Sequence, residues 1–379
     1  MVRVAHLSDT HLGYRQYNLD EREDDIYEVF NEIADKILEE RVDVVIHCGD
    51  LFDSWRPTTQ ANYAFKKFLD KLEGKTKLFS ILGDHDTPKR REMPPQMLFD
   101  DRICLLGLNG GEYQTVNVSG TEVLIAGISN LKRRYREILI SELKKLDAVA
   151  TKYEYSILAL HQAIEKFLPF KDVWELRLED LPKNFVYYAM GHLHSRIRAS
   201  HGRGELAYSG STEIGGKDEI SSWQKYGKGF YIVDLENDKV EITNVDLESI
   251  RPQLYERISY LDFDAQLKRL VDSLENYSKK PIVHLRIEGK QIDRQMVYEA
   301  LDKLLTNRTL RFRPEIIEAT EQKNVELKPG SFKIGAVLKE YLGDEEIASF
   351  ANELFNLLKY GDIHEAKIVA DRFYRGVKK

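Results

Sequence analysis

Short apolar runs and amphipathic stretches alternate through residues 1–248. The apolar runs have the length and β-branched content of buried strands. Between them, apolar residues recur every three or four positions, as on one face of a helix; Ile26, Val29 and Phe30 begin such a series. Strands that alternate with helices predict an α/β fold in which helices cover a sheet. The predicted strands are Val2–Leu7, Val42–His47, Leu78–Leu82, Val123–Ile128, Ser156–Leu160 and Val186–Met190.

A second pattern of the same kind follows Arg251 and Pro252. We therefore predict a small α/β domain at residues 249–319, which is long enough to fold independently. Residues 320–331 are polar, lack periodicity and contain a Pro-Gly pair, as is typical of a linker. The elements expected in the small domain are a strand at 254–261, a helix at 264–274, a strand at 281–288, a helix at 293–305 and a strand at 309–317.

Amphipathic helices are predicted in the last segment, residues 332–379. Its apolar positions include Leu338, Phe350, Leu354 and Phe355. A helical segment this short can hardly bury so many apolar side chains by itself, which favours a partner protein. The alternative is that the helices pack back on the main body.

Composition narrows the class of protein. Of the 379 residues, 42% are hydrophobic, which excludes global disorder. No apolar run approaches the ~20 residues that cross a bilayer, and the N-terminus lacks the apolar stretch of a signal peptide. We therefore expect a cytoplasmic protein without a membrane contact. The formal net charge of −7 argues against a histone-like DNA binder but leaves open a local basic surface.

Five predicted strands each end in a turn that carries aspartate or histidine. In layered α/β proteins, functional sites gather at the carboxyl ends of strands, where loops from several strands converge. We expect these five turns to form one site. The five segments are Val4–Gly13, Val44–Phe52, Phe79–Asp86, Ile157–Gln162 and Tyr188–Ser195.

The spacing within these turns predicts metal ligands. Side chains at positions i and i+2 of an extended segment point the same way, so Asp9 and His11 can hold one ion. Asp50 has two carboxylate oxygens and can bridge two ions. Mixed imidazole and carboxylate donors suit manganese, iron or zinc better than magnesium or calcium. The candidate ligands are Asp9, His11, Asp50, Asp84, His161, His192 and His194.

Two divalent ions about 3.5–4 Å apart support in-line attack on phosphorus. His85 directly follows the candidate ligand Asp84 and is expected to point elsewhere. It is the candidate catalytic residue, which could stabilise the transition state or protonate the leaving oxygen. His6 and His47 lie inside apolar runs and are expected in the core, as is Cys48.

The order of these motifs resembles the calcineurin-like metallophosphoesterases, whose pattern is D-x-H, G-D, G-N-H-[DE], a lone H and then G-H-x-H. Longer segments resemble the meiotic-recombination-eleven (SbcD-type) DNA double-strand-break repair nucleases, especially the short archaeal form. The resemblance covers essentially the whole chain. The segments that carry it are His11–Tyr27, Gly49–Pro57, Leu160–Gln162, Tyr187–Arg196, Tyr208–Glu213 and Lys228–Tyr231.

The resemblance implies a β-sandwich flanked by helices for residues 1–248, with mixed and doubled sheets. It implies two manganese ions per subunit and His85 as the catalytic histidine. The first ion would be held by Asp9, His11, Asp50 and His194, and the second by Asp50, Asp84, His161 and His192. The implied activities are single-strand endonuclease and 3′ to 5′ double-strand exonuclease, in DNA end processing for homologous recombination.

The resemblance also implies partners and a nucleoid-associated location. Residues 249–319 would form a capping domain that touches the DNA backbone. Residues 332–379 would bind the coiled-coil base of the Rad-fifty SMC-like ATPase in a two-plus-two complex. The helices around Thr58–Leu72 and Pro95–Phe99 would form a homodimer contact, although an ordinary core-facing helix would have the same pattern.

Two positions depart from the family pattern. Asp84 stands where the motif usually has asparagine, so the two ions would face three formal negative charges instead of two. We expect tighter metal binding and somewhat weaker Lewis acidity. Asp53 stands where some relatives place a second active-site histidine, so no second histidine is expected here.

Metallophosphoesterases also hydrolyse nucleotides and phosphoproteins, and basic residues around the motifs favour a polymeric substrate. Clusters at residues 89–91, at 132–136 and at Arg196, Arg198 and Arg203 could follow a phosphate backbone, or could be ordinary solvated surface. Tyr14, Tyr17 and Trp55 could stack on bases or pack beneath loops. A small-molecule phosphodiesterase and a catalytically inactive scaffold remain as alternatives.

Overall fold

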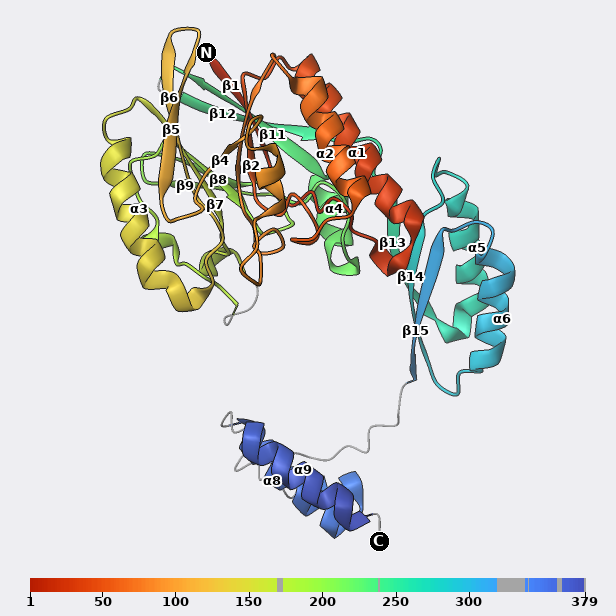
Figure 1. Ribbon diagram of the computed structural model, residues 1–379. Coiled ribbons are helices and arrows are strands. Elements are labelled where there is room, and N and C mark those ends of the chain that lie inside the picture. Colours follow the sequence, from red (N-terminus) through yellow and green to blue (C-terminus); the bar gives the residue numbers. More distant parts are fainter. Residues whose placement is uncertain (169–172, 238, 319–337, 340, 360–362, 378–379) are drawn as a thin grey trace. The chain divides into compact units, whose positions relative to one another are not determined.

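The computed structural model describes residues 1–168, 173–237, 239–318, 338–339, 341–359 and 363–377 (Figure 1). The chain forms two compact units, Met1–Ala319 and Thr320–Lys379. The expected linker at 320–331 and the start of the helical segment after it lie outside the described residues. Among the helices described, none is both long enough and apolar enough to span a bilayer.

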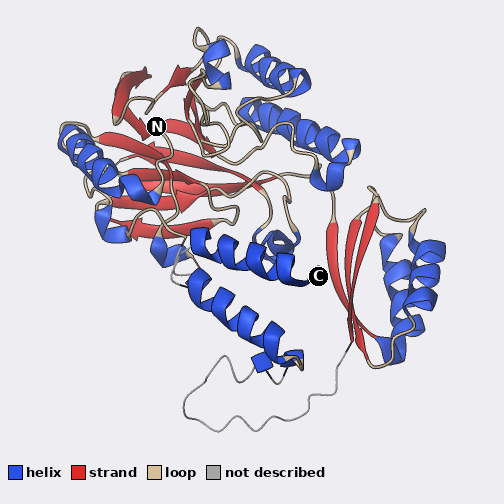
Figure 2. Cartoon of the chain, turned by 60° about the horizontal axis from the view of Figure 1, so that its bottom comes forward, coloured by secondary structure: helices blue, strands red, loops and turns tan. Residues whose placement is uncertain are grey.

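Two six-stranded sheets form the larger part of the first unit (Figure 2). Neighbouring strands of the first sheet are β12 (Lys239–Asp246), β11 (Gly229–Glu236), β1 (Val2–Leu7), β2 (Val44–Cys48), β3 (Lys77–Ile81) and β4 (Cys104–Leu105). Neighbouring strands of the second are β5 (Glu112–Val118), β6 (Thr121–Ile128), β7 (Tyr155–His161), β8 (Tyr187–Gly191), β10 (Gly204–Tyr208) and β9 (Ile197–His201).

The sheets pack face to face between two layers of helices. Val4, Ile46 and Ile81 of the first sheet share one buried core with Ile125 and Ile157 of the second. The outer face of the first sheet is covered by α1 (Asp20–Glu39), α2 (Thr59–Leu72) and the short α4 (Ile220–Tyr226). The outer face of the second is covered by α3 (Arg136–Ala150). The expected sandwich flanked by helices, with mixed and doubled sheets, is therefore confirmed.

The central strands of both sheets are parallel, and the outer ones are antiparallel except for the short edge strand β4. In the first sheet β1, β2, β3 and β4 run parallel, whereas β11 pairs antiparallel with β1. In the second, β6, β7, β8 and β10 run parallel. The six predicted strands all exist, but β4, β5 and β9 to β12 were missed. Several of these are edge strands with one exposed face, so they lack the continuous apolar run of a buried parallel strand.

Residues 253–318 form a three-stranded parallel sheet covered by two helices. Its strands are ordered β13, β14, β15, and the intervening helices share a separate apolar core with them. Both strand–helix–strand connections match the pattern predicted from the sequence. The elements are β13 (Gln253–Ser259), α5 (Phe263–Leu274), β14 (Ile282–Gly289), α6 (Arg294–Leu305) and β15 (Arg311–Glu318).

The described residues of the second unit include the helices α8 (Glu345–Lys359) and α9 (Ile363–Val377). They pack on each other, with the rings of Phe350 and Phe373 stacked at a centroid distance of 4.0 Å. Apolar side chains remain exposed on both helices, including Phe355, Leu358 and Ile368. The pairing therefore buries only part of the apolar surface in this unit.

A buried ionic network ties α1 to the start of the three-stranded domain. Arg22 and Asp25, both almost fully buried, form an ion pair of 2.7 Å. Asp25 also accepts hydrogen bonds from Arg251 at 2.5 and 2.9 Å. Glu213 lies 3.4 Å from Arg22 and accepts from the backbone N–H of Arg251. The charges of Arg22 and Arg251 are thus balanced by Asp25 and Glu213 in a place that water hardly reaches.

Asp25→Asn should destabilise the protein strongly. Removing one partner of a buried ion pair leaves an uncompensated charge and costs ~3–5 kcal/mol of unfolding free energy. The matched control is Asp35→Asn on the same helix, whose partner Lys71 lies 2.7 Å away in a half-exposed pair; exposed pairs are worth ~0–1 kcal/mol. Urea denaturation of both variants measures the difference, and equal midpoints would contradict this account of the network.

Candidate metal centre

The candidate residues converge because five parallel strands end at one edge of the sandwich. β1, β2 and β3 lead into the turns at Asp9, Asp50 and Asp84, and β7 and β8 end at His161 and just before His192. Among the described residues, ligand atoms of all seven candidates fall into overlapping groups of three within 4.8 Å of one another. The structure thus brings together every residue that the sequence singled out as a ligand.

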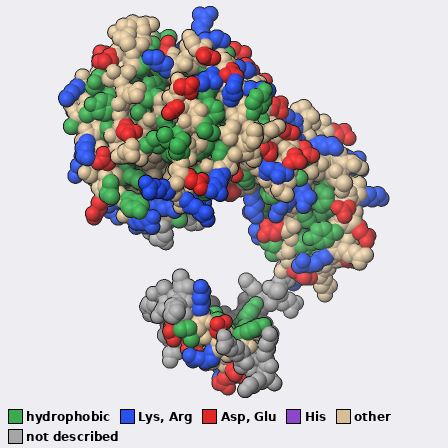
Figure 3. Space-filling model, viewed as in Figure 1, with side chains coloured by type: hydrophobic (Ala, Val, Ile, Leu, Met, Phe, Trp, Pro, Cys, Tyr) green, Lys and Arg blue, Asp and Glu red, His purple; other side chains and the backbone are tan. Residues whose placement is uncertain are grey.

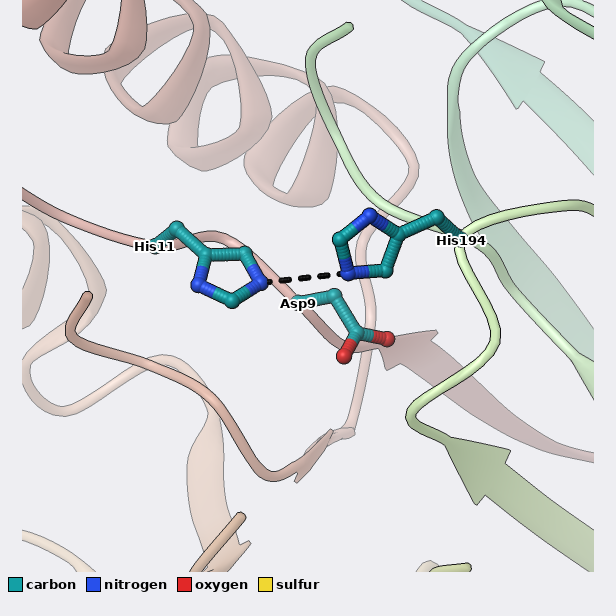
Figure 4. A group of neighbouring side chains, drawn as sticks. All are labelled: Asp9, His11 and His194. Atoms are coloured by element: carbon teal, nitrogen blue, oxygen red, sulfur yellow. Dashed lines mark hydrogen bonds between the residues drawn. The ribbon is translucent and has the colours of Figure 1, made fainter. Parts of the chain in front are cut away.

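The first group contains Asp9, His11 and His194. Figure 4 shows the two imidazoles facing each other, with Nε2 of His11 3.3 Å from Nε2 of His194. The Asp9 carboxylate accepts from Ser8 Oγ at 2.5 Å and from the His192 backbone N–H at 3.1 Å. Two ring nitrogens and a carboxylate therefore converge from β1 and β8, which belong to different sheets.

The second group contains Asp84, His161 and His192. Asp84 Oδ1 lies 3.4 Å from His161 Nε2 and 3.3 Å from His192 Nδ1. Burial opposes ionisation of Asp84, but these two histidines hold its pKa below the ordinary value. Burial likewise opposes protonation of His161, but Asp50 and Asp84 raise its pKa well above the ordinary value.

Asp50 stands between the two groups. Its Oδ2 is 3.8 Å from His11 Nε2 and 3.4 Å from His161 Nε2, whereas its Oδ1 accepts from the His85 backbone N–H at 2.9 Å. Burial would raise the pKa of Asp50, yet His161 and His11 hold it below the ordinary value. One carboxylate therefore faces both sets of imidazoles, as the bridging role requires.

The backbone at these turns is strained. Asp9, His11, Asp50 and His192 have φ values of 53°, 45°, 53° and 89°, in the left-handed region that non-glycine residues rarely occupy. Such residues cost ~1–3 kcal/mol each and cluster at functional sites. Gly83 allows the close approach of two turns, because a Cβ there would lie 2.0 Å from Asp50 Oδ1.

The donor set fits a divalent metal. His161 Nε2 and Asp84 Oδ1 are buried and have no hydrogen-bond partner in the described part of the chain. Buried polar atoms are normally satisfied, so these atoms point to a ligand that supplies the missing interaction. Imidazole and carboxylate donors at this density suit manganese, iron or zinc.

Hydrogen bonds from ring nitrogens orient the buried His161 and the half-buried His194. His161 Nδ1 lies 2.7 Å from the carbonyl oxygen of Cys48, and His194 Nδ1 lies 2.8 Å from Glu219 Oε1. A proton on Nδ1 in each ring leaves the Nε2 lone pair directed into the site. Glu219 was not predicted as a site residue, because it lies in no motif and becomes adjacent to His194 only through the fold.

Asp86 is a second residue to which the sequence analysis assigned no role. It is fully buried and accepts from the backbone N–H groups of Leu51 at 3.0 Å, Phe52 at 2.9 Å and Gly83 at 3.2 Å. Burial and the nearby Asp50 raise the pKa of Asp86 to about 6. It fixes the turns that carry Asp50 and Asp84, and its place at the end of the Gly83–Asp86 motif was the available signal.

His85 lies at the exposed rim of the site. Its side chain is 43% exposed, its ring centroid is 4.8 Å from that of His11, and its Nδ1 is 2.7 Å from the carbonyl oxygen of Asp53. This contact leaves Nε2 to face a ligand. Asp53 Oδ1 lies 3.5 Å from His11 Nδ1, so Asp53 contacts both His11 and His85. The residue that replaces the second histidine of some relatives therefore takes part in the site.

The expected core residues are confirmed. His6 and Cys48 are fully buried, and His47 nearly so. His6 Nδ1 lies 2.7 Å from the Tyr187 hydroxyl, and burial lowers the pKa of His6 and of His47 to about 3. Both histidines are therefore neutral core residues. His6 packs between the two sheets, whereas His47 shares the helix-covered face of β2 with Val45 and lies with its Nε2 3.1 Å from Thr10 Oγ1.

One of the predicted basic clusters, Arg196, Arg198 and Arg203, makes hydrogen bonds to backbone carbonyl oxygens within the protein. Arg196 is 8% exposed and donates to the carbonyl oxygens of Tyr226 and Val245. Arg203 donates to the carbonyl oxygen of Asn184, and Arg198 to that of Ile242. The suggestion that this cluster follows a phosphate backbone is therefore wrong for Arg196, which is buried. Arg198 and Arg203 are exposed as well as bonded to the protein, so for these two a phosphate contact stays a prediction.

The three aromatic residues that could stack on bases, Tyr14, Tyr17 and Trp55, all have contacts within the protein. The Tyr14 hydroxyl donates to the carbonyl oxygen of Gly215, and the Arg313 guanidinium lies 4.3 Å from the Tyr17 ring centroid. Both tyrosines thus contact neighbouring segments of the protein. Trp55 is half-buried, with the Arg56 guanidinium 4.2 Å from its ring centroid.

Comparisons with known proteins agree with this geometry. The family model for calcineurin-like phosphoesterases matches residues 2–196. A protein of Thermoplasma acidophilum named DNA double-strand break repair protein Mre11 is 37% identical over 362 residues, which cover 94% of each chain. Proteins of the same name are 38% identical in Saccharolobus solfataricus, over 79% of each chain, and 36% identical in Methanocaldococcus jannaschii, over 91% of each chain.

The chain belongs to the Mre11 family. This family lies within the calcineurin-like phosphoesterases, so the resemblance inferred from the motifs is confirmed. As a member of the Mre11 family, the chain is a hydrolase of phosphate esters that uses divalent metal, and its clustered carboxylates and imidazoles are candidate ligands for such an ion.

Asp84→Asn should weaken manganese binding. The substitution preserves size but removes one of three carboxylate charges from the site, so we expect a higher dissociation constant and a somewhat stronger Lewis acid. Manganese titration followed by electron paramagnetic resonance measures the affinity. The control is Asp43→Asn, which lies before β2 at the opposite end from Asp50 and accepts from the Arg3 N–H at 2.8 Å. Equal affinity for Asp84→Asn and the wild type would refute the expectation.

Proposed function

We propose that this protein is a manganese-dependent DNA nuclease of double-strand-break repair. It would cut single strands endonucleolytically and degrade double strands from 3′ to 5′, in end processing for homologous recombination. The observation that carries the proposal is the convergence of seven carboxylate and imidazole ligands, with Asp50 facing both groups. The printed function of the Mre11 relatives, DNA double-strand break repair, supports the choice of substrate.

We assign the first manganese to Asp9, His11, Asp50 and His194, and the second to Asp50, Asp84, His161 and His192. Two such ions, when bound, supply a hydroxide near neutral pH and neutralise charge on the phosphate. The chain's own contribution is to hold the ligands in strained turns before substrate arrives.

His85 would act on the leaving group. Its Nδ1 donates to the carbonyl oxygen of Asp53, which orients the ring and leaves Nε2 at the open rim. When Nε2 is protonated as well, the imidazolium can stabilise negative charge there or give its Nε2 proton to the leaving oxygen. The exposure of His85 supports a role in contacting substrate instead of a role in packing.

Basic surface near the site supports a nucleic-acid substrate. Lys89, Arg90 and Arg91 are exposed and follow the turn that carries Asp84 and His85. Lys132, Arg133 and Arg134 are exposed just before α3. Figure 3 shows lysine and arginine side chains gathered along the lower edge of the two-sheet body, where α3 begins in Figure 1. Such groups bind phosphates without reading sequence, so binding should weaken as salt rises.

His85→Ala should lower manganese-dependent cleavage of a labelled DNA hairpin by ~10²- to 10⁴-fold, the usual contribution of a positioned acid or base. Manganese affinity should stay near that of the wild type, because His85 is not assigned as a ligand. The same assay with a mononucleotide ester tests the small-molecule alternative. Faster hydrolysis of the ester than of DNA would refute the proposed substrate, and wild-type cleavage by His85→Ala would refute the assigned role.

We propose a division of labour among segments of the chain. Residues 1–248 would be the nuclease domain, 249–319 a capping domain that touches DNA backbone, 320–331 a linker and 332–379 a segment that binds an SMC-like ATPase. Exposed apolar side chains on α8 and α9 support the last assignment. A homodimer contact through α2 and Pro95–Phe99 is supported by the exposed side chains of Tyr63 and Leu98.

Deletion of residues 330–379 should abolish binding to the ATPase and leave manganese-dependent nuclease activity largely intact. The reason is that every assigned metal ligand lies in the unit Met1–Ala319. Pull-down with the ATPase and the hairpin assay measure the two effects. Phe355→Asp, at an exposed position of α8, is the matched point variant and should weaken only the pull-down. Loss of metal binding in the truncated protein would contradict the proposed division.

A further inference from the structure

Glu219 is a buried carboxylate that the proposed chemistry does not use directly. It ends a short helical turn, Lys217–Glu219, immediately before α4 and is 7% exposed. Its Oε1 lies 2.8 Å from Nδ1 of His194. A buried charge is costly unless it is paired, so a carboxylate held against a candidate metal ligand requires an explanation.

The second oxygen of Glu219 is held from two sides. Oε2 accepts from Ser211 Oγ at 2.9 Å and makes an ion pair with the Lys228 ammonium group. Lys228 is 3% exposed and also donates to the carbonyl oxygen of His194 at 2.9 Å. One lysine therefore restrains both the carboxylate that contacts the His194 ring and the backbone of His194 itself.

The two ligand candidates that use Nδ1 as a donor, His161 and His194, are held differently. His161 Nδ1 faces the neutral carbonyl oxygen of Cys48, whereas His194 Nδ1 faces the charged Glu219. A carboxylate acceptor raises the basicity of a ligand imidazole and fixes its tautomer. Asp84, the extra carboxylate of this site, lies in the group with His161 and not in the group with His194.

We propose that Glu219, locked by Lys228 and Ser211, is a positioning residue for His194. It keeps the proton of the neutral imidazole on Nδ1 and directs the Nε2 lone pair toward the group formed with Asp9 and His11. The carboxylate strengthens His194 as a ligand for the first ion, and the second ion is unaffected. This inference rests on the proposed two-metal function and adds residues from outside the five strand-end turns.

A purely structural explanation has different consequences. If Glu219 only neutralised Lys228, removing both charges together would restore the site. If it positions His194, the ligand stays impaired when the lysine charge is removed as well. The single variants Glu219→Gln and Lys228→Met and the double variant Glu219→Leu with Lys228→Met separate these cases. The double variant leaves no unpaired buried charge, and Lys228→Met alone shows the effect of losing the bond from Lys228 to the His194 carbonyl oxygen, which should be smaller than that of the double variant.

The test uses the full chain with two measurements. Manganese titration should show that Glu219→Gln and the double variant bind one of two ions 10- to 100-fold more weakly, as is typical for loss of such a partner, while the other ion binds as in the wild type. ¹⁵N NMR of metal-free protein should show the His194 proton on Nδ1 in the wild type and a mixture of tautomers in the double variant. Glu32→Gln, a half-buried carboxylate that accepts from the backbone N–H groups of Glu248 and Ser249, is the matched control.

The outcomes separate this inference from the proposed function. Two ions bound with unchanged affinity in the double variant would overturn the positioning role and leave the proposed function standing. Equal weakening of both ions, or restoration by the double variant, would assign Glu219 a structural role and also overturn the inference. If the wild type bound no manganese, the proposed function would fail, and the tautomer measurement would still decide whether Glu219 positions His194.

Discussion

The rest of the site depends on one geometric constraint: five parallel strands from two packed sheets end at the same edge. Asp9, Asp50 and Asp84 arrive from the first sheet, and His161 and His192 from the second. The sheets must be in close contact there, and the carbonyl oxygen of Cys48 in β2 accepts from the ring of His161 in β7 at 2.7 Å. A Cβ at Gly191 would lie 2.0 Å from that same oxygen, so glycine is required where the sheets meet.

Bringing the candidate ligands together lowers the stability of the folded protein, and interactions elsewhere in the fold must compensate for this. The Asp50 carboxylate lies within 4.8 Å of those of both Asp9 and Asp84, and four of the candidate ligands adopt left-handed backbone conformations. Neighbouring histidines partly balance the charge, and Asp86 ties the turns of Asp50 and Gly83 together through three backbone hydrogen bonds. The sandwich core between the helical layers stabilises this arrangement, because its interior strands are almost completely buried.

The sequence pattern predicted most of the buried parallel strands and missed the edge strands, together with β10 and β11. β2, β7 and β8 are continuous apolar runs and were found, whereas β5, β9 and β12 alternate between exposed and buried positions and were not. The arginines after His194 illustrate another limit. A basic cluster has the same sequence pattern whether its members extend into solvent or are buried against carbonyl oxygens of the protein, as Arg196 is.

By itself, the sequence determined the chemistry of the site: the donor types, their order along the chain, their positions after strands and the departure at Asp84. These are properties of short segments, in which residue identity and local spacing decide where a side chain can point. Only the tertiary structure decided which residues support the ligands. Glu219, 25 positions from His194, and Lys228, 34 positions away, meet it through the packing of α4 and β11 against the strand-end turns, and no local pattern encodes such a long-range contact.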